Sequence, residues 1–230
     1  MNIEYSRKDK MKQLAMVLII MQFALGQQTQ DGPPYSQIHS LVNNYHTISL
    51  PKVDVNALLE EDTYRELGTP YRYGFTHKGN YSPENSGIWE ETADGGILWQ
   101  VRFISESAYA ISFEYEELSI PEGGKLYVYT PDYEMIVGAY THLNNTGHGY
   151  FSTPLIKGDI AIIEYYQPAG VEGQFSLIIT EIIHDYRDIM DFSNNGRDWE
   201  CGVNVICETD ESYQGAINSV AFLDMGGFIC

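Results

Sequence analysis

Three cysteines near the C-terminal end of this sequence, Cys201, Cys207 and Cys230, carry its most distinctive chemistry. Thiols form disulfides in an oxidising compartment, or they bind metal ions as thiolates. Structural zinc sites usually place about two to four residues between paired cysteines, whereas Cys201 and Cys207 are separated by five and no second pair is present. The cysteines therefore predict disulfides. Because three is an odd number, we expect their partners further along a longer polypeptide.

No residue pattern in the sequence predicts a metal ion or a cofactor. His142 and His148 flank a turn-forming loop that lacks a cysteine or a second carboxylate at ligand spacing. Four other histidines are isolated and are expected to be surface groups or satisfied polar groups: His39, His46, His77 and His184. The pairs Gly123-Gly124 and Gly226-Gly227 are typical of turns rather than of a phosphate-binding loop. We therefore expect neither a cofactor nor a metal site.

The N-terminal residues predict a secretory signal peptide over residues 1–26. A basic stretch precedes an apolar run from Leu14 to Leu25, which is too short to span a bilayer. Small residues at Ala24 and Gly26 suit signal peptidase, so cleavage is expected after Gly26. This predicts a protein that is secreted or held in the cell envelope, with no membrane segment after signal removal.

The composition is strongly acidic, with 13 lysine and arginine residues against 32 aspartate and glutamate residues and a net charge of −19. A negative field of this size disfavours binding to nucleic acid and to anionic membrane surfaces. The charge carries no information about the fold.

The middle of the chain reads as a series of short strands separated by turns. Residues 97–103 and 109–115 alternate between apolar and other residues, which is the period of a sheet with one buried face. Residues 112, 114 and 116 (Ser, Glu and Glu) would then face water. Residues 159–166 are apolar on both faces up to Glu164, which predicts a central strand. At least seven such segments without a long helix predict an all-β fold, an antiparallel β-sandwich.

Polar segments flank this region on both sides. Residues 27–49 predict a loosely ordered leader, and residues 50–62 predict a short helix capped by Asp54 or Asn56. Residues 188–199 predict a linker. Arg187 and Arg197 are candidate processing sites for a protease, or else ordinary solvated charges.

Several motifs resemble the precursors of lysyl endopeptidase-type serine proteases, which are secreted and trypsin-like. The first is the C-terminal stretch, with its Cys-x5-Cys spacing, Met225-Gly226-Gly227 and Phe228-Ile229-Cys230. The second is the Asp-x-x-x-Leu-x-x-Glu-Asp stretch that begins at Asp54 and precedes an aromatic-Gly-Phe strand. Residues 85–89 (Asn-Ser-Gly-Ile-Trp) and 151–154 (Phe-Ser-Thr-Pro) are also similar to that family.

The resemblance implies a division of the chain into five parts. These are residues 1–26 as the signal peptide, 27–49 as a polar leader, 50–187 as a propeptide-like β-sandwich, 188–199 as a linker and 200–230 as the start of a serine protease domain. In this family the catalytic histidine, aspartate and serine follow the third cysteine, so no residue of this chain receives a catalytic role. The implied partners are the downstream protease domain and, in the full-length parent, a protein substrate.

One alternative stays open: a non-enzymatic secreted β-sandwich that binds carbohydrate or protein. The two interpretations differ in the cysteines. A finished module is expected to join Cys201 to Cys207. The protease resemblance implies separate partners beyond Cys230, and Val203 and Val205 favour an extended backbone that keeps Cys201 and Cys207 far apart.

Overall fold

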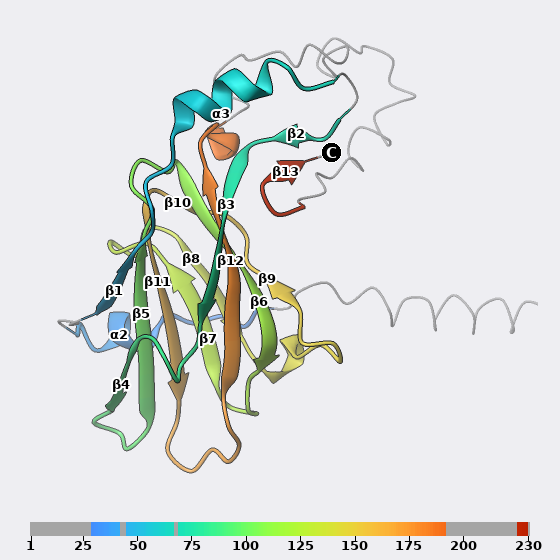
Figure 1. The fold of residues 1–230 in the computed structure, drawn as a ribbon. Coiled ribbons are helices and arrows are strands. Elements are labelled where there is room, and N and C mark those ends of the chain that lie inside the picture. Colours follow the sequence, from blue (N-terminus) through green and yellow to red (C-terminus); the bar gives the residue numbers. More distant parts are fainter. Residues whose placement is uncertain (1–28, 42–44, 67–68, 192–224, 230) are drawn as a thin grey trace, which may run out of the picture.

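The computed structural model describes residues 29–41, 45–66, 69–191 and 225–229, and Figure 1 shows their arrangement. Strands dominate these residues, and the helices among them are short. The elements in chain order are α2 (Tyr35–Ile38), β1 (His46–Ser49), α3 (Val55–Asp62), β2 (Tyr71–Arg72), β3 (Gly74–Tyr81), β4 (Ile88–Glu91), β5 (Ile97–Ile104), β6 (Ala110–Ser119), β7 (Lys125–Tyr129), β8 (Ile136–Tyr140), η1 (His142–Asn144), β9 (Phe151–Ser152), β10 (Ile156–Lys157), β11 (Ile160–Gln167), β12 (Ser176–Asp185), η2 (Ile189–Asp191) and β13 (Phe228–Ile229).

Two sheets pack face to face and form the body of the molecule. The six-stranded sheet has the order β1-β5-β11-β7-β8, with β4 also paired to β5. The five-stranded sheet has the order β10-β6-β12-β3, with β9 also paired to β6. The pairs within both sheets are antiparallel except β1–β5, which is parallel. The predicted all-β, sandwich-like fold is confirmed, and β11 is the central strand that the apolar run indicated.

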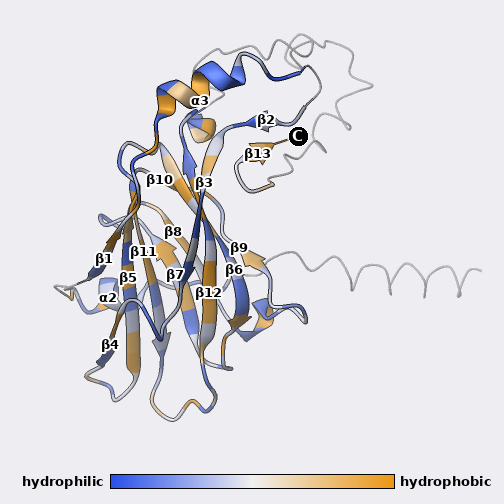
Figure 2. Cartoon of the chain, in the orientation of Figure 1, coloured by the Kyte–Doolittle hydropathy of each residue, from blue (hydrophilic) through white to orange (hydrophobic). Residues whose placement is uncertain are grey.

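The main core lies between these sheets and is rich in aromatic side chains. The six-stranded sheet contributes Trp99, Phe103 and Tyr165, and the facing sheet contributes Phe113 and Ile182, all less than 2% exposed. Figure 2 shows apolar residues along the strands of both sheets. Burial of such large apolar surfaces is the main free-energy gain that offsets the conformational entropy lost on folding.

The predicted strand faces hold in part. Ile111, Phe113 and Tyr115 point into the core as expected, and Glu114 and Glu116 are partly exposed on the opposite face. Ser112 is buried rather than facing water. It lies opposite Ile183 on the outer face of this sheet, and Ile183 belongs to a separate apolar cluster with Tyr73 and Ile229. On β5 both faces are largely buried, since a further segment covers the outer face of the six-stranded sheet.

That covering segment is the stretch predicted as a loosely ordered leader. Ser36 on α2 is fully buried, and its backbone N–H and Oγ both donate to Glu164 of β11. Glu164 is also fully buried, and it accepts further hydrogen bonds from Tyr129 Oη at 2.7 Å and Gln100 Nε2 at 2.8 Å. The sandwich therefore begins before the predicted boundary at residue 50, with α2 and β1 as parts of it. Leader residues 27, 28 and 42–44 lie outside the described residues.

The helix predicted after residue 50 is confirmed as α3. Asp54 is its N-cap, and its carboxylate accepts the backbone N–H of Ala57 at 3.1 Å. Leu58 packs with Val53 and Tyr186, which fixes α3 to the end of β12. This places the helix at one end of the sandwich (Figure 1).

We predict that Ser36→Ala destabilises the protein by about 1.5–3 kcal/mol, because a buried carboxylate loses a hydrogen-bond donor. Urea unfolding of residues 27–230 measures this change. Ser119→Ala is the matched control, since Ser119 is exposed on β6 and is expected to change the free energy of unfolding by less than about 0.5 kcal/mol. Equal stabilities of the two variants would show that the Ser36 contact is dispensable.

Candidate functional site

The candidate site lies at the end of the sandwich that carries α3. Here β13, from the C-terminal end of the chain, lies beside β2 (Figure 1). We call the surface formed by residues 71–74, Thr76 and Ile183, which receives residues 225–229, the docking site. Segments separated by about 150 positions in the sequence meet in it.

Backbone hydrogen bonds hold residues 225–229 in the docking site. Phe228 pairs with Arg72 and Ile229 with Tyr71 in an antiparallel two-stranded sheet. Gly227 O accepts the N–H groups of Tyr73 at 2.9 Å and Gly74 at 3.0 Å. Thr76 Oγ1 donates to Gly226 O at 3.0 Å. The contact is an added strand, a mode in which main-chain bonds supply affinity and side-chain pockets supply selectivity.

An apolar cluster receives one side chain of this segment. Ile229 is 5% exposed and packs with Tyr73 and Ile183, both fully buried. Tyr71 and Ile189 pack against the same cluster. Full burial of an isoleucine side chain stabilises a contact by about 1.5–3 kcal/mol.

Two glycines allow the backbones to approach this closely. Gly227 has φ +97°, and a Cβ there would lie 2.9 Å from the carbonyl oxygen of Gly74. A Cβ on Gly74 would lie 3.2 Å from Cα of Gly227, and 2.6 Å from Cγ2 of Ile183 on the neighbouring strand β12. A side chain at either position would push the two segments apart.

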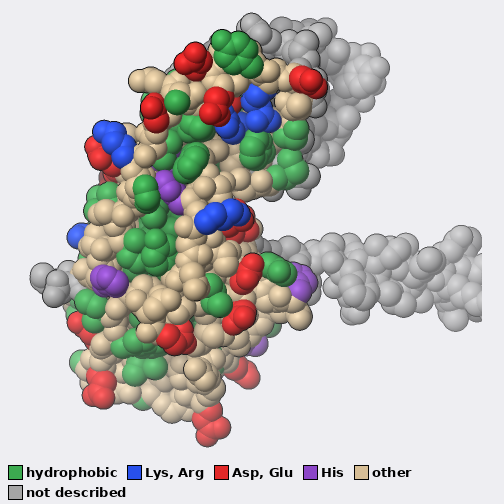
Figure 3. Space-filling view, viewed as in Figure 1, with side chains coloured by type: hydrophobic (Ala, Val, Ile, Leu, Met, Phe, Trp, Pro, Cys, Tyr) green, Lys and Arg blue, Asp and Glu red, His purple; other side chains and the backbone are tan. Residues whose placement is uncertain are grey.

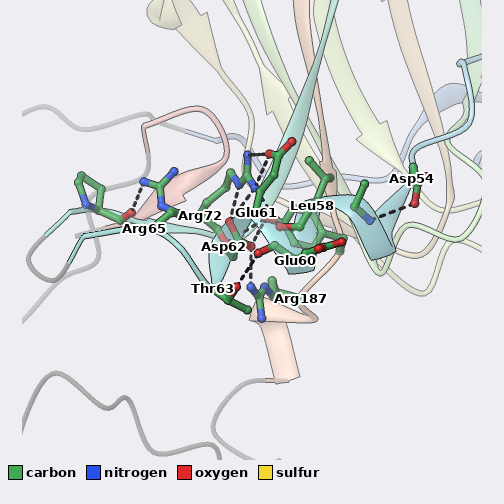
Figure 4. Close-up of polar contacts among 12 residues, drawn as sticks. Asp54, Leu58, Glu60, Glu61, Asp62, Thr63, Arg65, Arg72 and Arg187 are labelled. Carbon is green, nitrogen blue, oxygen red and sulfur yellow. Dashed lines mark hydrogen bonds and ion pairs between the residues drawn. The ribbon is translucent and has the colours of Figure 1, made fainter.

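The carboxylate of Asp62 on α3 holds β2 in position by contacting residues from two other segments (Figure 4). Its Oδ1 lies 2.7 Å from Nη2 of Arg72, and its Oδ2 accepts hydrogen bonds from Arg187 at 2.6 Å and from Tyr186 Oη at 2.8 Å. Arg72 also donates to the carbonyl of Leu58 at 3.0 Å, which ties β2 to the middle of α3. Figure 3 shows basic and acidic side chains side by side at the α3 end of the molecule.

Electrostatics keep this cluster charged at neutral pH. Burial alone would raise the pKa of Asp62, but hydrogen bonds from Arg187 and Tyr186 and the charges of both arginines outweigh it and lower that pKa. Burial, together with the bond to Asp62, raises the pKa of Tyr186 to about 12, so its hydroxyl remains a donor. The Asp62 side chain is 10% exposed, which makes these pairs more valuable than ion pairs on an open surface.

The carboxylate of Asp185 fixes the backbone of Arg187, whose side chain contacts Asp62. Asp185 is fully buried and accepts the backbone N–H groups of Arg187 at 2.8 Å and Ile189 at 3.0 Å. These bonds close the turn between β12 and η2. The guanidinium of Arg187 then lies 5.5 Å from the ring centroid of Tyr71, on the strand that pairs with β13.

A serine–histidine contact nearby has the geometry of a nucleophile and a base. Ser105 Oγ lies 2.7 Å from Nδ1 of His184, but both residues are 1% exposed. The Nε2 of His184 has no hydrogen-bond partner among the described residues, so no carboxylate orients the ring. The pair is closed to substrate, and we assign it no catalytic role.

Of the predicted disulfide and processing residues, the described part of the chain includes one. Arg187, a candidate processing site, belongs to the Asp62 cluster, and its side chain is 21% exposed. A protease needs an extended, accessible arginine at its cleavage point, so the folded chain does not present Arg187 in that form. Gly26, Arg197 and the three cysteines Cys201, Cys207 and Cys230 lie outside the described residues, as does most of the predicted protease segment 200–230 and of the linker 188–199. The linker's first residues form η2, whose Ile189 packs in the docking site.

The sequence did not predict the docking site, although several residues in and around this site belong to the motifs described above. Asp62 ends the Asp-x-x-x-Leu-x-x-Glu-Asp stretch, and Gly226 and Gly227 were expected only to form a turn. Two apolar residues after a glycine pair are a weak signal for strand addition. The pairing of Asp62 with Arg187 joins positions 125 residues apart, which no local pattern reveals.

Within the described ranges, no group of three or more histidine, cysteine or acidic residues is arranged to hold a metal ion. No helix there is both long and apolar enough to cross a membrane.

No family model matches the sequence. Among solved structures, the chain matches an isomalto-dextranase of Arthrobacter globiformis T6 complexed with panose, at 13% sequence identity and a TM-score of 0.20. The match covers 50% of this chain and 22% of that one. At this TM-score the likeness carries no argument.

We predict that Asp62→Asn destabilises the protein by about 1.5–3 kcal/mol, because both arginines lose a charged acceptor. The same change should release Arg187 and speed trypsin cleavage after it, which mass spectrometry of timed digests measures. Glu60→Gln is the control, since it removes a charge from an exposed position of the same helix. If Arg187 is cut equally fast in both variants, Asp62 does not hold it.

Two buried histidines predict a loss of stability in mild acid. Burial, with a contribution from the nearby His77, lowers the pKa of His184 from the usual 6.5 to about 4, and burial also lowers the pKa of His77. Between about pH 4 and pH 6.5, His184 therefore binds a proton in the unfolded chain but not in the folded chain. The free energy of unfolding should fall by about 2 kcal/mol from pH 7 to pH 5 through His184 alone.

Urea unfolding at the two pH values tests this expectation, with His184→Gln as the comparison. The variant keeps a polar group opposite Ser105 but does not titrate, so its stability should change less between pH 7 and pH 5. An identical pH dependence in both proteins would exclude His184 as the cause.

Proposed function

We propose that this chain is the N-terminal part of the precursor of a secreted trypsin-like serine endopeptidase. In this proposal the β-sandwich is the pro-domain, and it holds the beginning of the protease domain that follows. The proteolytic activity belongs to the longer parent, because the residues that would perform acyl transfer are expected downstream of Cys230.

The observation that supports this proposal is that residues 225–229 bind in the docking site. These residues belong to the stretch that resembles the start of the protease domain. They are held by main-chain bonds from Tyr73 and Gly74 and by burial of Ile229. A pro-domain must bind its own protease domain, and an added strand with one apolar anchor is a physical means of doing so.

The Asp62 cluster supports the same proposal. The edge of β2 is useful for docking only if its backbone is held in an extended and fixed position. Arg72 holds β2 to α3, and Arg187 holds it to the end of β12, both through Asp62. Among the described residues the docked segment is residues 225–229 alone, whereas a stable interface uses about 20–30 residues a side, so further contacts are expected from the downstream domain.

The proposal predicts where enzymatic activity is found. Purified residues 27–230 should hydrolyse no lysyl or arginyl ester, whereas the chain extended through its natural downstream coding sequence should do so after processing. Residues 27–191, added separately to the processed enzyme, should inhibit it. Thr76→Val in the added pro-domain should weaken that inhibition about threefold to tenfold, since one hydrogen bond to Gly226 is lost.

Two results would overturn the proposal. One is a downstream coding sequence that lacks a histidine, an aspartate and a serine able to form a triad. The other is an active enzyme that the sandwich neither inhibits nor binds. In either case the sandwich would be a separate binding module.

A further inference from the structure

A pocket lies away from the docking site, between the loop before β4 and the loop between β11 and β12. It has a volume of about 360 Å³ and is lined by Pro83, Glu84, Trp89, Ile97, Gln167, Gly173, Gln174 and Phe175. Ligand pockets in proteins span about 300–1,000 Å³, so this volume fits one or two sugar rings better than a folded partner. None of the contacts described for residues 225–229 involves these residues.

Trp89 gives this pocket an aromatic wall. The side chain is 42% exposed, although it lies on a strand that pairs directly with the fully buried Trp99. Its indole Nε1 donates to the carbonyl of Pro83 at 3.2 Å. The rings of Tyr165 and Phe175 meet it at 81° and 77°, and no described ring stacks parallel to it. Trp89 is therefore held in one orientation without a stacking partner.

Some polar groups at the pocket already make hydrogen bonds within the protein, and others make none to the described residues. Gln167 accepts a hydrogen bond from Tyr165 at 2.6 Å and donates to Val171 O at 2.9 Å, so it shapes the wall. The carboxylate of Glu84 and the amide of Gln174 have no hydrogen-bond partner among the described residues. Together they offer acceptors and donors beside an aromatic ring.

We propose that this pocket binds an uncharged pyranose sugar that stacks on Trp89. The apolar face of a pyranose matches the indole ring, while its hydroxyl groups can donate to Glu84 and accept from Gln174. Glu84 is the titratable residue of the lining, and the chain has a net charge of −19, so anionic ligands are disfavoured. The charged side chains visible at this end of the molecule in Figure 3 are acidic.

This inference goes beyond the pro-domain proposal and does not depend on it. A sugar site away from the docking site would let the sandwich attach to a glycan while the C-terminal segment stays bound. The sandwich would then bind the glycan and the C-terminal segment at two separate surfaces.

The test is a titration of ¹⁵N-labelled residues 27–230 with three uncharged probes: cellotriose, maltotriose and N,N′,N″-triacetylchitotriose. The indole N–H signal of Trp89, assigned with Trp89→Phe, should shift with at least one probe at millimolar concentration. Trp89→Ala should abolish binding, which the backbone amide signals of Glu84 and Gln174 in the pocket report because this variant lacks the indole. Gln174→Ala, at an exposed rim position that leaves the core intact, should raise the Kd about threefold to tenfold.

Tyr150→Ala is the matched control, because Tyr150 is 60% exposed and does not line the pocket. It should bind the same probe with unchanged Kd. The proposal is overturned if none of the three probes shifts the Trp89 signal, or if binding persists unchanged in both pocket variants. It is also overturned if a sulfated disaccharide or a lysine-containing peptide, but no uncharged sugar, shifts this signal.

Discussion

The end of the molecule that receives the C-terminal segment depends on the carboxylate of Asp62. Through Arg72 it joins α3 to β2, and through Arg187 and Tyr186 it joins both to the end of β12. A strand of two residues such as β2 has too few hydrogen bonds to hold its own position. The ion pairs supply that position, and the paired backbone of β13 then has a fixed edge on which to lie.

The buried carboxylate of Glu164 plays the corresponding part on the outer face of the six-stranded sheet. Glu164 would be costly inside the fold without donors, and Ser36, Gln100 and Tyr129 supply them. Because Ser36 comes from the N-terminal side of the sandwich, the burial of Glu164 fixes that segment in place. One acidic side chain thus attaches the N-terminal segment to the sandwich, and another supports the strand on which residues 225–229 lie.

The sequence predicted the sandwich because alternation and apolar runs report directly on strands, as in β6 and β11. It also predicted the Asp54 cap, which is a local interaction. It did not predict that Ser36 belongs to the fold, because a polar segment without periodicity gives no sign that a buried glutamate needs its hydroxyl group. The docking site was missed for a related reason, since Asp62 and Arg187 are 125 residues apart in the sequence and meet only in the folded chain.

Amide hydrogen exchange of residues 27–230 tests most directly whether the sandwich holds the segment that follows it. The amides of Tyr73 and Gly74 donate to Gly227 O, so they should be protected in the wild-type chain and exchange much faster in Ile229→Asp. Met225→Asp, at a residue that is 44% exposed, should leave them protected, and the amides of β11 should be slow in all three proteins. Equal exchange of Tyr73 and Gly74 in the wild type and in Ile229→Asp would contradict the account.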